Sequence, residues 1–559
     1  MLIDNIVVAF ASVFTAYNMM LMALGAFTGL IAGAIPGFTI TMAVVLTLPF
    51  TFGMEPISGL ATMLGVYVGS TTGGMFACAL IGIPGTPSSI ATTFDAFPMA
   101  RNGRPGLAVG IGIWASFFGG IISAVLLAVL APTLALVGLE FGPWDYFMLI
   151  AFSLTMAASL SGEAMLKGLI AGTLGLLLAC VGEDTINGVA RFTYGIEPLK
   201  SGFAFLPVLV GLFAFSQLLS DLSDTEKAKV PMLPKGSQIA RVEHRAAIRE
   251  LVIHWTSLVR CSLIGLFIGI LPALGGSISN ILAWDQERKA SKTPERFGTG
   301  IPEGVIASES ANNATSGGAL ITMMALGIPG DIVTAIMLGA LTIHNIAPSP
   351  TFISTQPQLA YGIIIAYFLA NFVSLALCVP ALRTFVTLMR IPLYAMASVI
   401  LFYCAVGVFS LDNSLFDVWT LLVFGVIGFM LSKFKFPLAP MILGVVLGPV
   451  AESNLSRSLA TSDDLSLFFT RPWSLFFFVV AVFSIVFPWY QAARGKARWA
   501  EFFMPALAIV LAVPTGMMGG MFRTSAAAAL LGFGLWRTVR QFHQPAPAGR
   551  WNWFTSRRG

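Results

Sequence analysis

The pattern best suited to chemistry occurs twice in the chain, as a hydroxyl-rich run into Gly-Gly that is followed by Ile-Pro-Gly. The first copy, STTGGMFACALIGIPG, begins at Ser70, and the second, ATSGGALITMMALGIPG, begins at Ala314. Proline removes a backbone donor and glycine permits a bend, so we expect each helix to break at its Ile-Pro-Gly. A broken helix frees N–H groups that attract anions and carbonyls that attract cations. The two copies together therefore predict one substrate or ion site built from both.

Hydroxyl and amide side chains surround both breaks, and they can hold a carboxylate without a buried Lys or Arg. Close helix packing, as in Gly29-x-x-x-Gly33, competes with this interpretation for any single small residue. For Glu309 the sequence leaves two interpretations open, a proton or Na⁺ site and a helix-end carboxylate. For Asp95 the helix-end carboxylate is favoured. Asp331 is either a charge at a helix N-terminus or an ion ligand. The polar candidates are Ser70, Thr71, Thr72, Thr86, Ser88, Ser89, Ser277, Ser279, Asn280, Asn312, Asn313, Thr315 and Ser316.

The composition places these segments in a membrane protein. Of the 559 residues, 57% are hydrophobic and 10% are charged, whereas about 25% are charged in a typical soluble protein. Runs of roughly 20 apolar residues recur along the chain, which predicts many transmembrane helices. The five cysteines show no paired spacing, so a disulfide or metal framework is not expected. The first apolar stretch lacks a basic flank and is too long for a signal peptide, so we interpret it as a membrane segment.

The basic residues predict the orientation, because cytoplasmic loops are enriched in Lys and Arg. We expect a periplasmic N-terminus, a cytoplasmic linker at 222–255 and a cytoplasmic C-terminus. Because SLIGLFIGILPALGGSISNILAW has basic residues on both sides, it must enter and return as a hairpin; GAIPGFTI near the N-terminus has Pro-Gly in the same place. This threading leaves 26 of the 31 basic residues inside, and the exceptions are Arg191, Lys200, Arg457, Arg471 and Arg523.

Matching motifs divide the chain into two transmembrane repeats, 1–221 and 256–472, joined by the linker. Equivalent loops carry basic residues in opposite halves, which predicts inverted repeats, an architecture of secondary transporters. We expect an all-α polytopic fold with broken helices or re-entrant hairpins. Residues 473–559 should add three spans and a basic tail with Trp551 and Trp553. The matched positions are Gly29, Gly33 and Pro36 with Gly265, Gly269 and Pro272; Ser70–Gly74 with 314–318; and Pro207 and Gly211 with Pro440 and Gly444.

Enzyme and nucleic-acid functions find no support in the sequence. The four histidines have no metal spacing, and no nucleophile elbow or Walker A motif is present. No cofactor is expected, so an ion gradient would have to supply the driving force. The basic residues lie in short loops between spans, which is not the footprint of a nucleic-acid binder.

Three blocks resemble the large membrane subunit of tripartite tricarboxylate transporters: GAIPGFTITMAVVLTLPFTF, the stretch from GSTTGG to RPGLA, and FGTGIPEGVIASESANNATSGGALITMMALGIPGDIVTAIM. The likeness covers roughly residues 15 to 475. It implies a bacterial inner-membrane permease that imports citrate-like or other small carboxylates with Na⁺ or H⁺. It also implies a periplasmic solute-binding protein and a small membrane subunit as partners. By the same resemblance the favoured positions are Gly73, Gly74, Pro84, Gly85, Asn312, Asn313, Gly317, Gly318, Pro329 and Gly330.

The chain departs from the family pattern at several motif positions. It has Thr72 and Met75 around the first Gly-Gly, Ala96-Phe97 where the family has Gly-Tyr, Ser308 in place of a proline, and Ala273 in place of a glycine. These changes bear on the substrate more than on the fold. The alternatives are a stand-alone permease or an exporter of small organic anions, and, from another class, a membrane enzyme or scaffold. An elevator-like motion of the paired hairpins is a further hypothesis.

Overall fold

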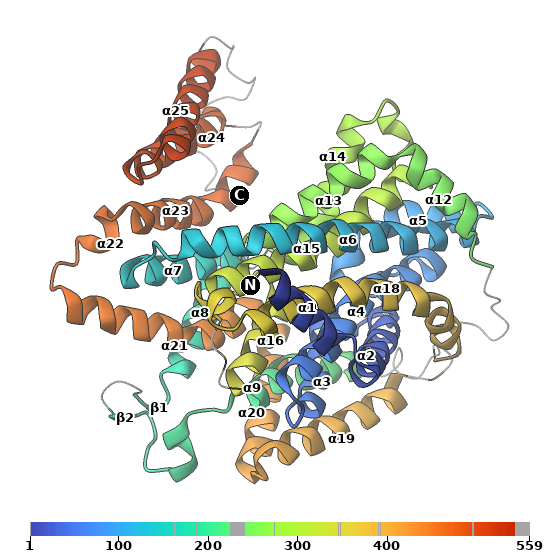
Figure 1. Cartoon of the computed structure of the whole chain (residues 1–559), viewed down its shortest axis with the longest axis horizontal. Coiled ribbons are helices and arrows are strands. Elements are labelled where there is room, and N and C mark those ends of the chain that lie inside the picture. The colour runs from blue at the N-terminus through green and yellow to red at the C-terminus, as the bar shows by residue number, and fades with distance from the viewer. Residues whose placement is uncertain are drawn as a thin grey trace, which may run out of the picture.

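The computed structural model confirms the expected all-α polytopic architecture (Figure 1). Long helices cross one another in the main body, and the last helices project at one end. Within the described residues the strands are β1 (Gly182–Glu183) and β2 (Ala190–Arg191), an antiparallel pair with Gly182 opposite Arg191. The structure describes residues 2–159, 164–184, 188–223, 241–272, 274–344, 346, 348–388, 391, 393–494 and 497–542.

The helices of the first half alternate long apolar segments with short broken ones. Ile-Pro-Gly separates a long helix, α4, from a short 3-10 turn, η1, as the sequence predicts. The elements are α1 (Leu2–Val13), α2 (Ala16–Ala34), α3 (Ile40–Thr51), α4 (Pro56–Ile81), η1 (Pro87–Ser89), α5 (Thr92–Arg101), α6 (Pro105–Gly138), α7 (Pro143–Ser159), α8 (Met165–Ala179), the 3-10 helix η3 (Glu197–Ser201), α9 (Phe205–Leu209), the π-helix η4 (Val210–Phe215) and α10 (Ser216–Leu222).

The second half repeats this order, with Ile-Pro-Gly between α15 and α16. Its elements are α12 (His244–Ile253), α13 (Trp255–Ile270), α14 (Gly275–Ala290), the 3-10 helix η5 (Pro294–Arg296), α15 (Pro302–Leu326), α16 (Ile332–Ile343), α17 (Phe352–Thr355), α18 (Pro357–Leu388), α19 (Leu393–Asp412), α20 (Leu415–Lys433), α21 (Leu438–Thr461) and α22 (Leu467–Thr470).

The two halves pack through reciprocal pairs of helices. Within the halves α2 packs on α4, and α13 packs on α15. Across the halves α6 packs on α15 while α18 packs on α4, and α8 packs on α21 while η4 packs on α20. Each contact thus has a counterpart with the halves exchanged, as expected of two repeats related by a two-fold axis. The direction of that axis relative to the membrane, and with it the inversion, stays a prediction.

Eight helices among the described residues are long and apolar enough to cross a membrane, and nine are if the bent pair α12–α13 counts as one span. The two members of that pair meet at 82°. Several shorter apolar helices, including α3, α8 and α16, accompany them. Short helices of this kind are the broken segments that the proline and glycine pattern predicts.

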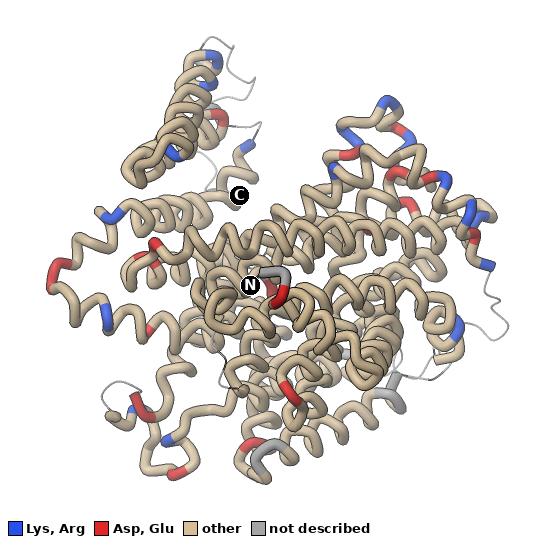
Figure 2. The backbone as a smooth tube through the Cα atoms, in the orientation of Figure 1, with Lys and Arg blue, Asp and Glu red and all other residues tan. Residues whose placement is uncertain are grey.

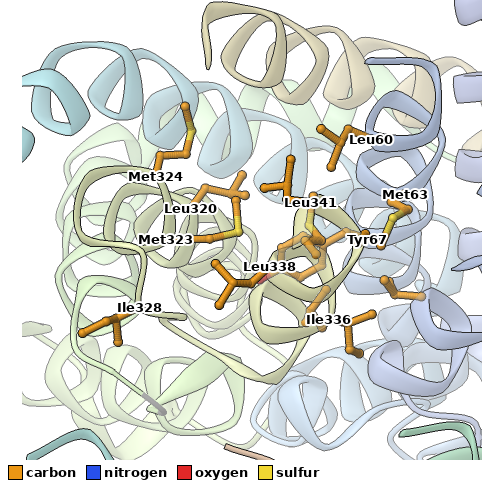
Figure 3. Close-up of a cluster of buried hydrophobic side chains, with 14 of the residues drawn as sticks. Leu60, Met63, Tyr67, Leu320, Met323, Met324, Ile328, Ile336, Leu338 and Leu341 are labelled. Atoms are coloured by element: carbon orange, nitrogen blue, oxygen red, sulfur yellow. The ribbon is translucent and has the colours of Figure 1, made fainter. Parts of the chain in front are cut away.

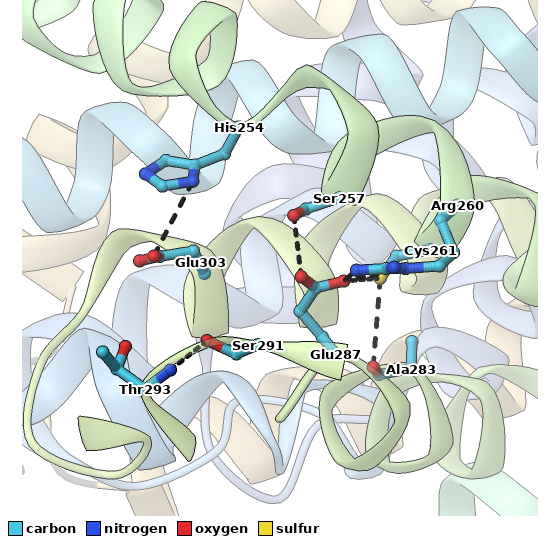
Figure 4. A network of polar contacts seen from close by, with 9 residues as sticks. All are labelled: His254, Ser257, Arg260, Cys261, Ala283, Glu287, Ser291, Thr293 and Glu303. Carbon is cyan, nitrogen blue, oxygen red and sulfur yellow. Dashed lines mark hydrogen bonds and ion pairs between the residues drawn. The ribbon is translucent and has the colours of Figure 1, made fainter. Parts of the chain in front are cut away.

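A buried polar network holds α13 and α14 together as the expected hairpin (Figure 4). Arg260 of α13 lies 2.5 Å from Glu287 of α14, whose side chain is buried. Ser257 donates a hydrogen bond of 2.7 Å to the other carboxylate oxygen of Glu287. The Arg260 side chain is partly exposed, but its loss would leave the buried Glu287 carboxylate without its ion-pair partner, so the network ties the two arms into a unit.

The apolar core is continuous between the halves. Figure 3 shows Leu60 and Met63 of α4 near Leu320, Met323 and Met324 of α15 and the side chains of α16. Because lipid chains are as apolar as these residues, close packing and internal hydrogen bonds, more than the hydrophobic effect, hold helices together in a membrane. The core therefore positions α4, α15 and α16 against one another.

Charged residues lie mainly at helix ends and loops, and Lys and Arg gather around α12 and α14 (Figure 2). Four of the five basic residues expected on the periplasmic side contact an acid. These pairs are Arg191–Glu452, Lys200–Glu197, Arg471–Asp145 and Arg523–Glu140. The Arg523 guanidinium lowers the pKa of Glu140 below its usual value. Each of these four basic residues thus has an acidic partner, and the orientation of the chain stays a prediction.

One expectation needs correction at the end of the second repeat, and the linker has one feature that was not predicted. The last part of the linker forms α12, which packs on α6 through a Glu243 N–H to Gly106 carbonyl bond of 3.1 Å. The C-terminal region forms three helices, α23 (Pro472–Ala493), α24 (Arg498–Met517) and α25 (Met521–Phe542). Only α23 and α24 are candidate spans, because three arginines lower the hydropathy of α25. The basic tail with Trp551 and Trp553 lies outside the described residues.

Candidate substrate and ion site

Each Ile-Pro-Gly motif ends a long helix by the same backbone device. Gly82 caps α4 with φ 71°, and Gly327 caps α15 with φ 68°. A side chain in this left-handed region costs about 1–2 kcal/mol, so glycine is required there. The proline two residues later cannot donate a helical hydrogen bond, and the chain leaves the helix axis.

The last glycine of each motif lies against the broken hairpin of its own half. A methyl group added at Gly85 would lie 2.3 Å from the carbonyl oxygen of Gly33, and one added at Gly330 would lie 2.5 Å from that of Gly269. Both contacts are shorter than any carbon–oxygen approach tolerates, so only glycine fits. The doubled motif therefore brings each hairpin turn and each helix break to one place.

The chain resumes after each break with a capping box. Thr86 begins η1, and its N–H donates to the Ser89 hydroxyl at 3.3 Å. Asp331 begins α16; its carboxylate accepts from the Thr334 N–H at 2.7 Å, and its own N–H donates to the Thr334 hydroxyl at 3.0 Å. The two halves thus share the same geometry at equivalent positions, one with a neutral cap and one with an acid.

A cavity of about 520 Å³ lies where these segments meet. The N-terminal ends of α3, η1, α14 and α16 all reach it, through Thr39, Pro87, Gly275 and Asp331. Free N–H groups at a helix start favour an anion, and among these elements α14 is the full helix without a side-chain cap, because Thr39 caps α3 and Asp331 caps α16. The lining residues are Thr39, Ile40, Thr41, Tyr67, Thr71, Pro87 and Ser88 from the first repeat motifs; Leu274, Gly275, Gly276, Ser277, Ile278, Asn312, Thr315, Ser316, Asp331, Ile332 and Val333 from the second; and Ala157, Phe213, Gln217, Ser432, Phe436, Leu438 and Ala439.

The predicted polar residues divide between this cavity and the packed interior. Thr71, Ser277, Asn312 and Thr315 line the cavity, together with Ser88 and Ser316. The remaining members of the predicted set do not line it, and the glycines and prolines among them shape the breaks. The members that lie outside the lining are Ser70, Thr72, Gly73, Gly74, Pro84, Gly85, Thr86, Ser89, Ser279, Asn280, Glu309, Asn313, Gly317, Gly318, Pro329 and Gly330.

Asn312 has an unsatisfied oxygen beside the cavity. Its amide nitrogen donates to the Thr71 carbonyl at 3.3 Å, which joins α15 to α4. Its amide oxygen is buried and has no hydrogen-bond partner within the part of the chain that the structure describes. A buried polar atom without a partner costs about 1–3 kcal/mol, so a bound ligand that satisfies it is favoured.

Asn313, next in sequence, points into the interior instead. Its oxygen accepts from Thr72 at 2.9 Å, and its nitrogen donates to the Glu309 carbonyl at 3.1 Å. These bonds connect α15 to α4 and to the preceding turn of its own helix. The side chain of Asn313 therefore stabilises the contact between the halves and has no unused donor or acceptor directed at the cavity.

Glu309 lies behind the cavity in a polar network between four helices. Its carboxylate accepts from the Thr92 hydroxyl at 2.5 Å and from the Ser116 hydroxyl at 2.9 Å. Asn280 of α14 lies next to Thr92, with 3.4 Å between its amide nitrogen and the Thr92 hydroxyl. The network joins α5, α6, α14 and α15, and it is fully buried.

Glu309→Ala should destabilise the protein much more than Glu309→Gln. Alanine leaves a void and two hydroxyls without their acceptor, a loss of about 2–5 kcal/mol, whereas glutamine keeps the shape and one acceptor. The thermal unfolding temperature of the detergent-purified variants measures the difference. Equal unfolding temperatures for the two variants would show that the network does not hold the helices together.

Asp95 is a structural carboxylate, as the sequence favours. One oxygen accepts from the backbone N–H groups of Gly298, Gly300 and Ile301 at 2.9, 3.0 and 3.2 Å. The other accepts from the Trp284 indole at 2.8 Å. Because Ile301 precedes the first residue of α15, Asp95 fixes the start of the helix that carries the second motif.

The sequence analysis missed Tyr67, whose hydroxyl donates to the Asp331 carboxylate across the two halves. A usable signal existed, because Tyr67 precedes Thr71 by four residues and so shares its helix face. Thr39, Thr41, Gln217 and Ser432 also line the cavity without having been predicted. Gln217 and Ser432 lie far from both motifs in sequence, and only the packing of α10 and α20 brings them there.

Broken helices from two halves that meet at a cavity inside an apolar body are characteristic of a membrane transporter. Comparison with known families agrees, since the sequence model of the "Tripartite tricarboxylate transporter TctA family" matches residues 19–443. The chain belongs to this family, which confirms the resemblance noted in its motifs.

Two proteins of Agrobacterium vitis are similar to the chain. The first, an "Uncharacterized 52.8 kDa protein in TAR-I ttuC' 3'region", is 34% identical over 497 residues, which is 89% of this chain and 98% of that protein. The second, an "Uncharacterized protein in TAR-II ttuC' 3'region", is 35% identical over 209 residues, or 37% of this chain and 86% of that protein. Membership of the family makes the chain a component of a membrane transporter.

Proposed function

We propose that the chain is the large permease subunit of a binding-protein-dependent secondary transporter that imports tricarboxylates or other small carboxylates, driven by a Na⁺ or H⁺ gradient. It acts in the bacterial inner membrane with a periplasmic solute-binding protein and a small membrane subunit. Its N-terminus lies in the periplasm and its C-terminus in the cytoplasm. No cofactor other than the coupling ion takes part.

The cavity between the two broken helices is the single observation that carries this proposal. Helix N-terminal ends and hydroxyls surround it, and no Lys or Arg is among its lining residues. Such a lining binds carboxylates through N–H and O–H donors and avoids the cost of burying a basic side chain in a membrane. Residues of both halves are needed to close the site, so a relative motion of the halves can open it to either side.

Asn312→Ala should lower carboxylate uptake by about 10- to 100-fold, because the amide nitrogen that donates to Thr71 has a second N–H for a carboxylate, and a hydrogen bond to a charged group is worth about 1.5–3 kcal/mol. Uptake of radiolabelled citrate and other small carboxylates into vesicles measures this, with the binding protein supplied and with or without a Na⁺ gradient. Asn454→Ala is the matched control, since Asn454 donates only to the Val450 carbonyl of its own helix.

The possible outcomes separate the alternatives. Uptake that follows an ion gradient and fails in Asn312→Ala but not in Asn454→Ala supports the proposal. Equal uptake without the binding protein would favour a stand-alone permease, and outward movement alone would favour an exporter. Uptake that is the same in Asn312→Ala and in the wild type would exclude the cavity as the substrate site.

A further inference from the structure

The acid at the start of α16 is not needed for capping. Thr86 and Asp331 occupy equivalent positions, directly after the two Ile-Pro-Gly motifs, and each begins a helix with a capping box. In the first half the same position holds a neutral threonine, at the start of the three-residue η1. Threonine, asparagine and aspartate are all good caps, so the local geometry does not explain a carboxylate at position 331.

Asp331 is the one Asp, Glu, Lys, Arg or His among the residues that line the cavity. It is 9% exposed. One of its oxygens accepts from the N–H and hydroxyl of Thr334 at 2.7 and 2.8 Å, and the other accepts from Tyr67. Tyr67 of α4 is the titratable group that faces it, and the lining residues from α3, α14, α15 and α21 include no other titratable side chain.

An ionised Asp331 conflicts with an anionic substrate in the same cavity. Like charges repel strongly where water is sparse, and the lining provides no basic residue to offset the repulsion. Protonation of the carboxylate removes the conflict. Both oxygens of Asp331 already accept hydrogen bonds, from Thr334 and from Tyr67, and the phenol oxygen of Tyr67 can accept a hydrogen bond from the acid form.

We propose that Asp331 is the proton-carrying residue of the transport cycle. Water on the side of substrate entry supplies a proton, which forms an O–H bond at the Oδ2 atom of Asp331 as the carboxylate substrate binds. After the cavity opens to the other side, that bond breaks and the proton passes to water there as the substrate leaves. This inference rests on the proposed function, and it narrows the coupling ion to the proton.

The test uses the complete transporter in proteoliposomes, with the small membrane subunit and the binding protein, labelled citrate and a pH dye trapped inside. In the wild type an inward proton gradient should drive accumulation, and citrate entry should acidify the lumen. A gradient of about one pH unit supports about tenfold accumulation per proton at zero membrane potential, since tenfold corresponds to about 1.4 kcal/mol. Asp331→Thr, which keeps a good capping residue, should lose this accumulation but still exchange labelled for unlabelled citrate across the membrane.

Asp285→Asn serves as the control, because Asp285 is partly exposed, pairs with Lys289 and does not line the cavity; it should behave as the wild type. Glu309→Gln tests the competing buried carboxylate. Three results would overturn the assignment of Asp331. They are accumulation that only a Na⁺ gradient drives, proton-driven accumulation that survives in Asp331→Thr, and proton-driven accumulation that is lost in Glu309→Gln but not in Asp331→Thr. The wild-type dependence on Na⁺ or H⁺ is decisive even if a variant fails to fold. If the wild type moves no citrate at all, the proposed function itself is overturned, and this result differs from each of those that overturn the role of Asp331 alone.

Discussion

Gly33→Val should prevent the protein from accumulating in folded form. A methyl group at Gly33 would lie 2.0 Å from the Ser70 carbonyl oxygen and 2.7 Å from the Ser70 Cα atom. These are backbone atoms within the α2–α4 crossing, so no side chain can move aside. Overpacking usually costs about 1–3 kcal/mol, and we expect more here because the carbonyl of Gly33 also faces Gly85. Both the helix crossing and the docking of the first motif would be lost.

The yield of monodisperse protein after detergent extraction and its thermal stability measure this effect. Gly269→Val should behave in the same way, because a methyl group at Gly269 would lie 2.2 Å from the Thr315 carbonyl oxygen in the equivalent crossing. Gly532→Val is the control, since this helical glycine of α25 has open space where a side chain would lie. Stability of Gly33→Val equal to that of Gly532→Val would refute the packing described for the two hairpins.

Asp95→Asn should destabilise the N-terminal end of α15, the second motif helix, by about 2–3 kcal/mol. The amide can keep its oxygen toward the three backbone N–H groups, but its NH₂ group then meets the Trp284 indole N–H, so two donors face each other. Leaving a buried donor without an acceptor carries this cost. The unfolding temperature of the purified protein is the measurement.

A double-mutant cycle isolates the cause. In Trp284→Phe the indole N–H is absent, so adding Asp95→Asn should cost clearly less than it does in the wild type. Such non-additivity is expected of residues in direct contact. If Asp95→Asn costs the same in both backgrounds, the Trp284 hydrogen bond does not contribute. Asp285→Asn, on the exposed face of the same helix as Trp284, should have no measurable effect.

Much of the fold was predictable because it depends on local chemistry. Helices end at Ile81 and Leu326 and resume at Pro87 and Ile332, as the proline and glycine spacing predicts. The hairpin between α13 and α14 was also predicted, from the charges that flank it. The prediction that α25 is a membrane span did not hold. This alanine-rich helix with arginines at both ends is long enough to cross a membrane, but its hydropathy is too low.

The candidate site was predictable as a region but not residue by residue. Thr71, Asn312 and Thr315 line the cavity, whereas Glu309 and Asn313, on the same helix as Asn312, face the packed interior. A sequence motif does not show which of its residues face the cavity and which face the packed interior. The helices that pack around the motif helix determine this. Here α6 and α13 pack on α15 and determine which of its faces is left for the cavity.

The sequence by itself determined that the chain is a polytopic membrane protein of two matched halves, that each half contains one broken helix and one hairpin, and that hydroxyl and amide groups accompany each break. These properties follow from composition, proline and glycine, which act within a few residues. Only the tertiary structure decided that Tyr67 faces Asp331, that Asn312 keeps an unsatisfied oxygen at the cavity, and that Gln217 and Ser432 reach it. Those facts depend on contacts between residues far apart in the chain, which no local pattern encodes.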